Sequence, residues 1–454
     1  MRGSARRGTA RRLLRRLPGC PCHPQRGPSP RYAGLAALLL VAACGPADPS
    51  GTEADAAAPG SENDALSWRI PGDVPPEASE QADFEDFAWR TFIALSWPAG
   101  PGGGPDTTAV IGAGGDAPTV WEQYSETGAV FRPGAAEPEP WGEGQPIPPA
   151  CRAGGAGAGE RVVRMIHKAD VLTDFVQPQT APVVDQSGGW ARYGVSLNRV
   201  VYDYVVDNGL YDRSVQEGFG VVDFPVGTYG GPPGAMTLKS AWKVLDGSED
   251  AGRFHTRTAW VYTPAAGDRP AECASETLGL VGFHVGHKTE SHPQWIWATF
   301  EQVDNLVPPP GGSVASFRDP GCDSCRANQP PPPPWDPTEP GPPTQVERVI
   351  PIPRETAERN AAWQSRLASA GEDSPWPHYE LVGVQRARTP SDTVGIGAPT
   401  PTFLANALLE TYLQGEVPNV SSSCAQCHHE AATWSGAFGD YVYAFVHAQS
   451  PEGP

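Results

Sequence analysis

The chain has 454 residues, and 52 Gly and 52 Pro put much of it in loops, although 39% hydrophobic residues with 14 Trp suffice for a sizeable core. We therefore expect one or two packed units rather than the three domains that the length alone suggests. The formal net charge is −19; without the first 43 residues, which hold nine Arg and no acidic residue, 24 basic residues face 52 acidic ones, a net charge of −28. This charge excludes nucleic acid and anionic membrane surfaces as favourable partners.

The first 43 residues are organised like a signal peptide. Their arginines precede an apolar run, Tyr32 to Ala43, that is too short to span a bilayer and ends in small residues. The sequence LVAACG at 40–45 resembles a bacterial lipobox, which would make Cys44 the lipid-modified first residue of an outer-membrane lipoprotein facing the periplasm or the cell surface. A soluble periplasmic protein is the alternative. Either route leads to an oxidising compartment.

Residues 44–80 are rich in Ala, Pro, Gly, Ser and acidic residues without hydrophobic periodicity, and this composition predicts a flexible, lipid-anchored tether. A β-rich body with helices is predicted over 81–307. Its first helix covers 84–95, where apolar residues recur at helical spacing, and stops at Trp97-Pro98. Between 99 and 159 the Gly/Pro-rich sequence predicts irregular segments.

A strand is predicted over Arg161–His167, and a helix over Leu197–Asn208 with Ser196 as N-cap and Gly209 as its stop. Four β-like segments follow, which we expect to form a meander of antiparallel strands. They are Met236–Leu245, Phe254–Tyr262, Leu278–Thr289 and Trp295–Val303.

Residues 308–343 contain runs of Pro and predict a polyproline-like linker before a helical C-terminal region, 344–454. In that region we expect a helix near 355–370 that ends at Gly371 and a short strand over Tyr379–Gln385. The fold class predicted for the whole is α+β: an antiparallel β-rich body with flanking helices, a small helical C-terminal segment and many Gly/Pro loops.

Two further helices are predicted in the C-terminal region. The first has Thr400 as N-cap and Pro401 at its first position, carries the stripe Leu404, Leu408 and Tyr412, and closes at Gly415. The second follows from the spacing of Phe438, Tyr441, Val442 and Phe445.

Between these stripes lies Cys424-Ala425-Gln426-Cys427-His428, a C-x-x-C-H run. This spacing is typical of covalent haem c: both thiols add to haem vinyl groups as thioethers, and the following His binds the iron. We predict one haem c held by Cys424, Cys427 and His428, with the two apolar stripes as its walls. A disulfide or half of a zinc site is the alternative.

The sixth iron ligand decides between a closed carrier and an open iron that small molecules reach. No Met follows the motif, so a His–Met carrier with a downstream Met is excluded. Downstream, His447 is a candidate distal ligand, whereas His429 adjoins the proximal residue. Upstream, strand alternation in LVGFHVGHKT at 280–289 places His287 at the end of an apolar face, with His284 and Lys288 on the other face. His287 is thus a candidate distal group or a hydrogen-bonded core His.

Trp295 and Trp297 share one face of the next predicted strand, as core packing or as an electron-relay pair. The remaining cysteines come out even once Cys20 and Cys22 leave with the signal peptide. Four are left, which predicts two disulfides with three possible pairings: Cys151, Cys273, Cys322 and Cys325.

Four segments together carry a family resemblance: FAWRTFIALSWP at 87–98, LVGFHVGHKTESHPQWIWATFEQVDN at 280–305, NALLETYLQ at 406–414 and SCAQCH at 423–428. As a set they resemble secreted bacterial proteins labelled "cytochrome c family protein", with one C-terminal C-x-x-C-H run and a lipoprotein-like start. The resemblance covers most of residues 82–449. It implies that the β-rich segment and the haem motif form one functional unit, and it implies no substrate.

Three functions are compatible with these features. The first is an exported, lipid-anchored monohaem cytochrome that passes single electrons to or from a redox partner with a basic docking face. The second is a haem enzyme of peroxidase or oxidase type whose β-rich body forms an open distal site. The third is a structural zinc protein in which Cys322 and Cys325 join Cys424 and Cys427.

Overall fold

The computed structural model describes residues 66–113, 117–164, 181–332, 335–336, 338–390, 398–415 and 423–451. The predicted signal peptide, Cys44 and the tether as far as residue 65 lie outside the described residues. So do residues 165–167 of the strand predicted at Arg161–His167.

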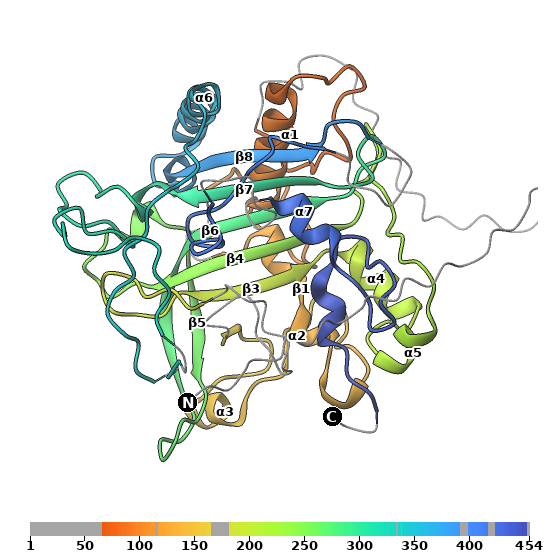
Figure 1. Ribbon diagram of the computed structural model, residues 1–454, viewed down its shortest axis with the longest axis horizontal. Coiled ribbons are helices and arrows are strands. Elements are labelled where there is room, and N and C mark those ends of the chain that lie inside the picture. The colour runs from red at the N-terminus through yellow and green to blue at the C-terminus, as the bar shows by residue number, and fades with distance from the viewer. Residues whose placement is uncertain are drawn as a thin grey trace, which may run out of the picture. The chain divides into compact units, whose positions relative to one another are not determined.

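The described residues form a nine-stranded, mainly antiparallel sheet in the order β1-β3-β4-β6-β7-β8-β9, with β5 paired to β6 and β2 paired in parallel to β5 (Figure 1). This confirms the predicted α+β fold with an antiparallel β-rich body. The strands are β1 (Ser125–Glu126), β2 (Val162–Val163), β3 (Arg192–Leu197), β4 (Met236–Val244), β5 (Thr256–Thr263), β6 (Glu272–His287), β7 (Ile296–Gln302), β8 (Tyr379–Ala387) and β9 (Pro399–Thr400). The α-helices are α1 (Gln81–Leu95), α2 (Thr127–Val130), α3 (Pro149–Gly154), α4 (Arg199–Asp207), α5 (Arg213–Gly218), α6 (Arg354–Ala370) and α7 (Cys424–His429).

Strand β6 organises the sheet because it is long enough, at 16 residues, to have different partners along its length. Its first half pairs with β5, and its second half pairs with β4 on one side and β7 on the other. The four predicted strands are confirmed, but the meander is wrong: β4 pairs with β6 and not with β5. Strand β4 pairs with the edge of β6 opposite to the one that β5 occupies, since Leu278 and Gly279 of β6 are paired with both strands at once.

One face of the sheet is covered by α1, as predicted from its apolar spacing. Phe92 of α1 stacks on Phe300 of β7 with ring centroids 4.2 Å apart. On its outer side α1 meets α6, where Trp89 Nε1 donates to Asn360 Oδ1 at 3.1 Å. Helix α6 and its end at Gly371 also match the prediction, as does strand β8.

Segments on either side of the predicted linker belong to one sheet, because β8 pairs with β7. Within the Pro-rich stretch, Phe317 is buried. At the other end of the body, Leu66, Trp68 and Ile70 pack against the core, so chain that we predicted as tether is packed from residue 66 onward.

Two local predictions are wrong: the N-cap of α4 and the helix over 400–415. Helix α4 is capped by Asn198, whose side chain accepts from Val201 N, because Ser196 is already in β3. No helix forms over 400–415: Thr400 lies in β9, and Asn406 Oδ1 accepts from Leu408 N and Leu409 N in a turn. Leu404 and Leu408 are nevertheless buried.

The helix expected after the motif is reduced to a short 3₁₀ segment, Tyr443–His447. The backbone of Asp440 and Tyr441 has φ of 47° and 65°, in the left-handed region that a right-handed helix cannot accommodate. Apolar spacing alone does not reveal such a break.

Two disulfides are present, as the cysteine count predicted, and the pairing is Cys151–Cys273 and Cys322–Cys325. Cys424 and Cys427 are in neither disulfide and are half-buried. Within the described ranges, none of the helices combines the length and the apolar character needed to cross a membrane.

We expect Glu122 to make stability depend on acid pH. Burial by itself raises the pKa of this carboxyl, but His255, Arg161 and Arg257 around it lower the pKa to about 2, from 4.5. Because the folded pKa lies below the unfolded one, the stabilisation is full above pH 4.5 and is lost as pH falls toward 2. Urea unfolding between pH 5 and pH 2.5 should show this loss, up to about 3 kcal/mol, in the wild type and not in Glu122→Gln.

The exposed substitution Glu355→Gln serves as the matched control and should keep the wild-type pH slope. Equal slopes in the wild type and in Glu122→Gln would contradict the assignment.

Candidate functional site

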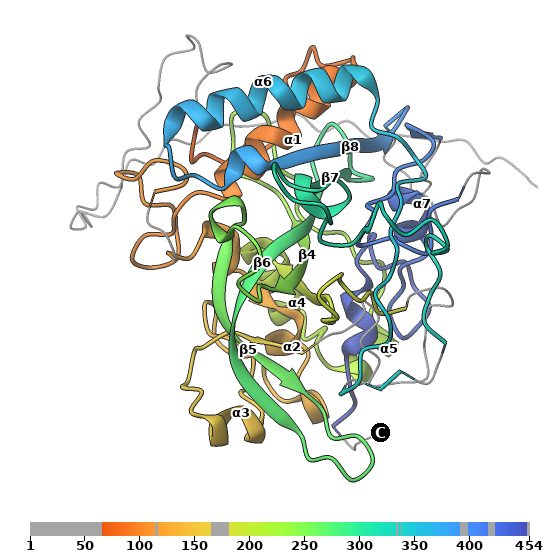
Figure 2. The same cartoon turned by 90° about the vertical axis from the view of Figure 1, so that its left-hand side faces the viewer.

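The C-x-x-C-H run folds as one short helix, α7, on the sheet face opposite α1 (Figures 1 and 2). Ser423 is its N-cap, and its side chain accepts from Gln426 N at 3.3 Å. Cys424 and Cys427 are three positions apart, so both thiols leave the helix on the same side. The two motif cysteines, which are in neither disulfide, therefore lie on the same side of α7.

Gln385 of β8 attaches α7 to the sheet. Its Oε1 accepts from Ala425 N at 2.9 Å and from Ser423 Oγ at 3.1 Å, while its Nε2 donates to the carbonyl oxygen of Pro401. Gln385 is fully buried. The start of the motif is therefore fixed by a strand of the sheet and not by a loop.

The imidazole of His428 is oriented by the backbone. Its Nδ1 lies 2.7 Å from the carbonyl oxygen of Tyr441. A carbonyl only accepts, so Nδ1 carries the proton, and in the neutral ring Nε2 is the acceptor that Lys239 Nζ approaches to 3.2 Å. Trp297 packs on the ring with centroids 4.4 Å apart, and Tyr443 meets it edge-on at 5.3 Å.

The Tyr441 carbonyl lies in a segment of left-handed backbone that the hydrogen bonds of the Asp440 carboxylate stabilise. Asp440 Oδ2 accepts from Lys288 Nζ at 2.6 Å and from Phe224 N at 2.8 Å, and its Oδ1 accepts from Trp295 Nε1. Burial raises the pKa of Asp440, and Lys288 opposes that effect. Trp295 also has a positive φ of 67°. Left-handed backbone at three non-glycine residues beside His428 is held by these contacts and indicates a site that needs an exact ring orientation.

A polar row on the sheet faces the motif. Lys239 of β4 is in register with His284 of β6, which is in register with Thr299 of β7. Lys239 Nζ lies 3.2 Å from His428 Nε2, and His284 Nε2 lies 3.2 Å from Glu410 Oε2. The β-rich body therefore contributes charged groups directly to the surroundings of His428.

The structure does not bring His287 to the motif. Strand alternation was correct, but it directs His287 to the α1 face, where its ring stacks on Phe87 at 5.3 Å. The side chain is 1% exposed, and neither ring nitrogen has a hydrogen-bond partner among the described residues. Burial lowers the pKa of His287 to about 3, so the ring is neutral. It is a core histidine separated from His428 by the sheet.

The other predicted residues lie closer to the motif. His447 ends the 3₁₀ segment, 6.5 Å from the ring of Phe131, in a hollow that Tyr193 and Val195 also line. Trp295 and Trp297 are both buried and stack at 5.8 Å, with Trp297 in contact with His428.

The donor set fits covalent haem. Such attachment requires two cysteines that are not joined in a disulfide, one helical turn apart, and an imidazole whose Nδ1 is hydrogen-bonded, and α7 has all three. The lysine ammonium at Nε2 shows that the ring presents this nitrogen to a cation. The zinc alternative lacks its ligands, since Cys322 and Cys325 are bonded to each other. In the part of the chain that the structure describes, no group of three His, Cys, Asp or Glu side chains could hold a metal ion.

Sequence reasoning missed Lys239, Gln385 and Asp440. Lys239 stands out little in its own strand, because β4 also contains Thr237, Ser240 and Lys243. Nothing local marks Gln385 or Asp440, because their roles depend on partners far away in the chain.

We predict that Asp440→Ala destabilises the protein by about 3–5 kcal/mol in urea unfolding, because it removes the buried carboxylate that pairs with Lys288 and leaves Lys288 only its exposed partner, Asp223. It also removes the acceptor of Phe224 N and Trp295 Nε1. Asp223→Ala is the matched control: Asp223 also contacts Lys288, at 2.5 Å, but its side chain is 84% exposed. That change should cost about 1 kcal/mol or less. Equal losses for the two variants would show that Asp440 has no special structural role.

The chain matches no protein-family model, no curated protein and no solved structure. The resemblance to "cytochrome c family" proteins therefore stays a prediction, and the function has to be inferred from the geometry around His428.

Proposed function

We propose that the protein is an exported monohaem c-type cytochrome that transfers single electrons. The observation that carries this proposal is the pairing of two cysteines outside the disulfides with an imidazole whose Nδ1–H is bound to the Tyr441 carbonyl. A haem held here supplies an iron that changes its charge by one electron.

Each residue of the motif has a separate role in this proposal. Cys424 and Cys427 would each hold one vinyl group of the haem as a thioether, with the thiol hydrogen passing to carbon, so that no leaving group would be produced. His428 would bind the iron through Nε2. The Tyr441 carbonyl accepts from Nδ1–H, fixes the tautomer and increases the basicity of Nε2. Trp297 and Tyr443 keep the ring in place and exclude water from it.

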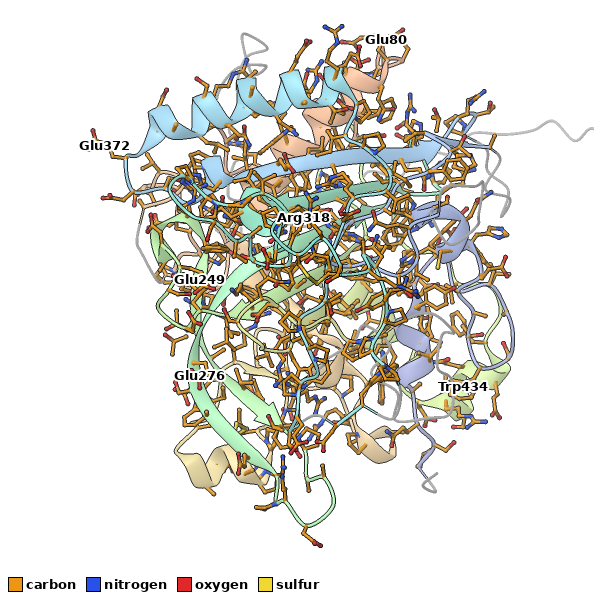
Figure 3. The ribbon with its side chains drawn as sticks, turned by 60° about the vertical axis from the view of Figure 1, so that its left-hand side comes forward. Glu80, Glu249, Glu276, Arg318, Glu372 and Trp434 are labelled. Atoms are coloured by element: carbon orange, nitrogen blue, oxygen red, sulfur yellow. A yellow bond between two sulfur atoms is a disulfide. The ribbon has the colours of Figure 1, made fainter. Side chains whose placement is uncertain are left out.

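The charge of the chain supports a basic redox partner. A net charge of −28 after loss of the first 43 residues attracts cationic surfaces and repels nucleic acid. Glu80 and Glu372 are exposed, and Figure 3 shows them at the periphery. In this proposal Cys44 carries lipid at the outer membrane, so that the membrane is contacted through the anchor alone.

A haem enzyme with an open distal site is the second candidate. It is favoured by the polar row on the sheet: Lys239 contacts His428, and its cross-strand neighbour His284 contacts Glu410, so these side chains could serve as acid–base groups. In this version the β-rich body acts on a small molecule at the iron.

The attachment test uses the full chain produced with a cytochrome c maturation system. We expect a covalent haem stain on a denaturing gel and a pyridine haemochrome spectrum for the wild type, and neither for Cys424→Ala/Cys427→Ala. Cys322→Ala/Cys325→Ala should retain both signals. A wild type that binds zinc and no haem, or a stain that survives loss of both motif cysteines, would contradict the proposal.

Carbon monoxide separates the carrier from the enzyme. A carrier with both axial positions filled should bind the gas slowly or not at all when reduced, because a ligand must first leave the iron. Stopped-flow mixing of the reduced protein measures this. Rapid, stoichiometric binding would contradict the closed carrier and favour the enzyme.

A further inference from the structure

Lys239 is placed to face whatever His428 binds. Its Nζ lies 3.2 Å from Nε2, the nitrogen that the Tyr441 carbonyl leaves available. Both side chains are partly buried. The two nitrogens therefore point into one shared space between α7 and the sheet.

The backbone of Lys239 is held in place from both sides. It is in register with Val195 of β3 and with His284 of β6, in the interior of the sheet. Its four-carbon stem, in contrast, is flexible. If Nζ of Lys239 and Nε2 of His428 bound one metal ion from opposite sides at about 2 Å each, the two nitrogens would lie about 4 Å apart. Nζ would then have to withdraw by roughly 1 Å from its present position, which the flexible stem permits.

Other nitrogen and sulfur ligands within the described ranges are less well placed. His287 and Met236 are paired across β6 and β4 on the α1 face, on the far side of the sheet. His447 is oriented toward Phe131 and the β3 edge. Lys239 is the candidate whose side chain contacts Nε2 of His428, with Nζ at 3.2 Å.

We propose that Lys239 is the distal ligand of the haem iron, bound through its neutral amine opposite His428. This inference rests on the proposed function. Binding uses the nitrogen lone pair, so the ammonium releases one proton to solvent and no electron is transferred. His284, its cross-strand neighbour, is turned toward Glu410, with Nε2 3.2 Å from Glu410 Oε2. The result is an iron closed on both faces without a methionine.

The test compares covalently loaded wild type with Lys239→Ala and Lys239→Arg by electron paramagnetic resonance of the ferric state. Arginine keeps the charge and the length but cannot lose its proton to become a ligand. We expect a low-spin signal in the wild type and its loss to a high-spin signal in both variants. Carbon monoxide should bind faster to both reduced variants than to the wild type.

Rival ligands provide the controls: His447→Ala and His287→Ala should leave the low-spin signal unchanged. A low-spin signal that persists in Lys239→Arg, or that disappears in His447→Ala, would overturn the proposal. If the Lys239 variants do not fold, wild type labelled with ¹⁵N at lysine side chains should show ¹⁵N hyperfine coupling to the iron, and its absence would also overturn it. Covalent haem in the wild type is scored first by gel stain, so that failure of haem attachment is distinguished from failure of lysine ligation.

Discussion

The hydrogen bond from His428 Nδ1 to the Tyr441 carbonyl decides which nitrogen the C-x-x-C-H motif offers. It exists because Asp440 and Tyr441 take left-handed backbone angles, which the contacts of the Asp440 carboxylate with Lys288, Phe224 and Trp295 hold. A helix at this point would have turned the carbonyl along its own axis. The motif is therefore completed by a segment that departs from regular structure.

The sheet separates two environments with different chemistry. On the α1 face, aromatic rings and a neutral His287 form a dry core. On the α7 face, Lys239 contacts His428, and its neighbour His284 contacts Glu410. Because alternate residues of β4 and β6 point to opposite faces, the same two strands supply both the core and the charged surroundings of the motif.

The sequence allowed the elements to be predicted better than their connections. Periodicity located α1, α6 and the central strands, because these depend on local spacing. It did not show that β4 pairs with β6, since local spacing does not reveal that β4 joins the edge of β6 opposite to β5 and β7. It also failed at 400–415, where Asn406 makes contacts to Thr299 and Phe300 that replace a helix with a turn.

For the site, the motif residues were identifiable from spacing because attachment chemistry fixes their order. Of the two interpretations of His287, a distal group or a core histidine, the structure has the core histidine, because its strand face lies against α1. His284 had been assigned correctly to the other face. Its neighbour Lys239 belongs to a different strand, and the register between two strands cannot be predicted from either segment alone.

Mass spectrometry of the mature, unlabelled protein and of its proteolytic peptide containing residues 423–428 tests the central claim most directly. The account predicts that this peptide carries one haem and that neither Cys424 nor Cys427 reacts with a thiol reagent. A peptide without added mass, whose two cysteines remain free or are joined in a disulfide, would contradict it.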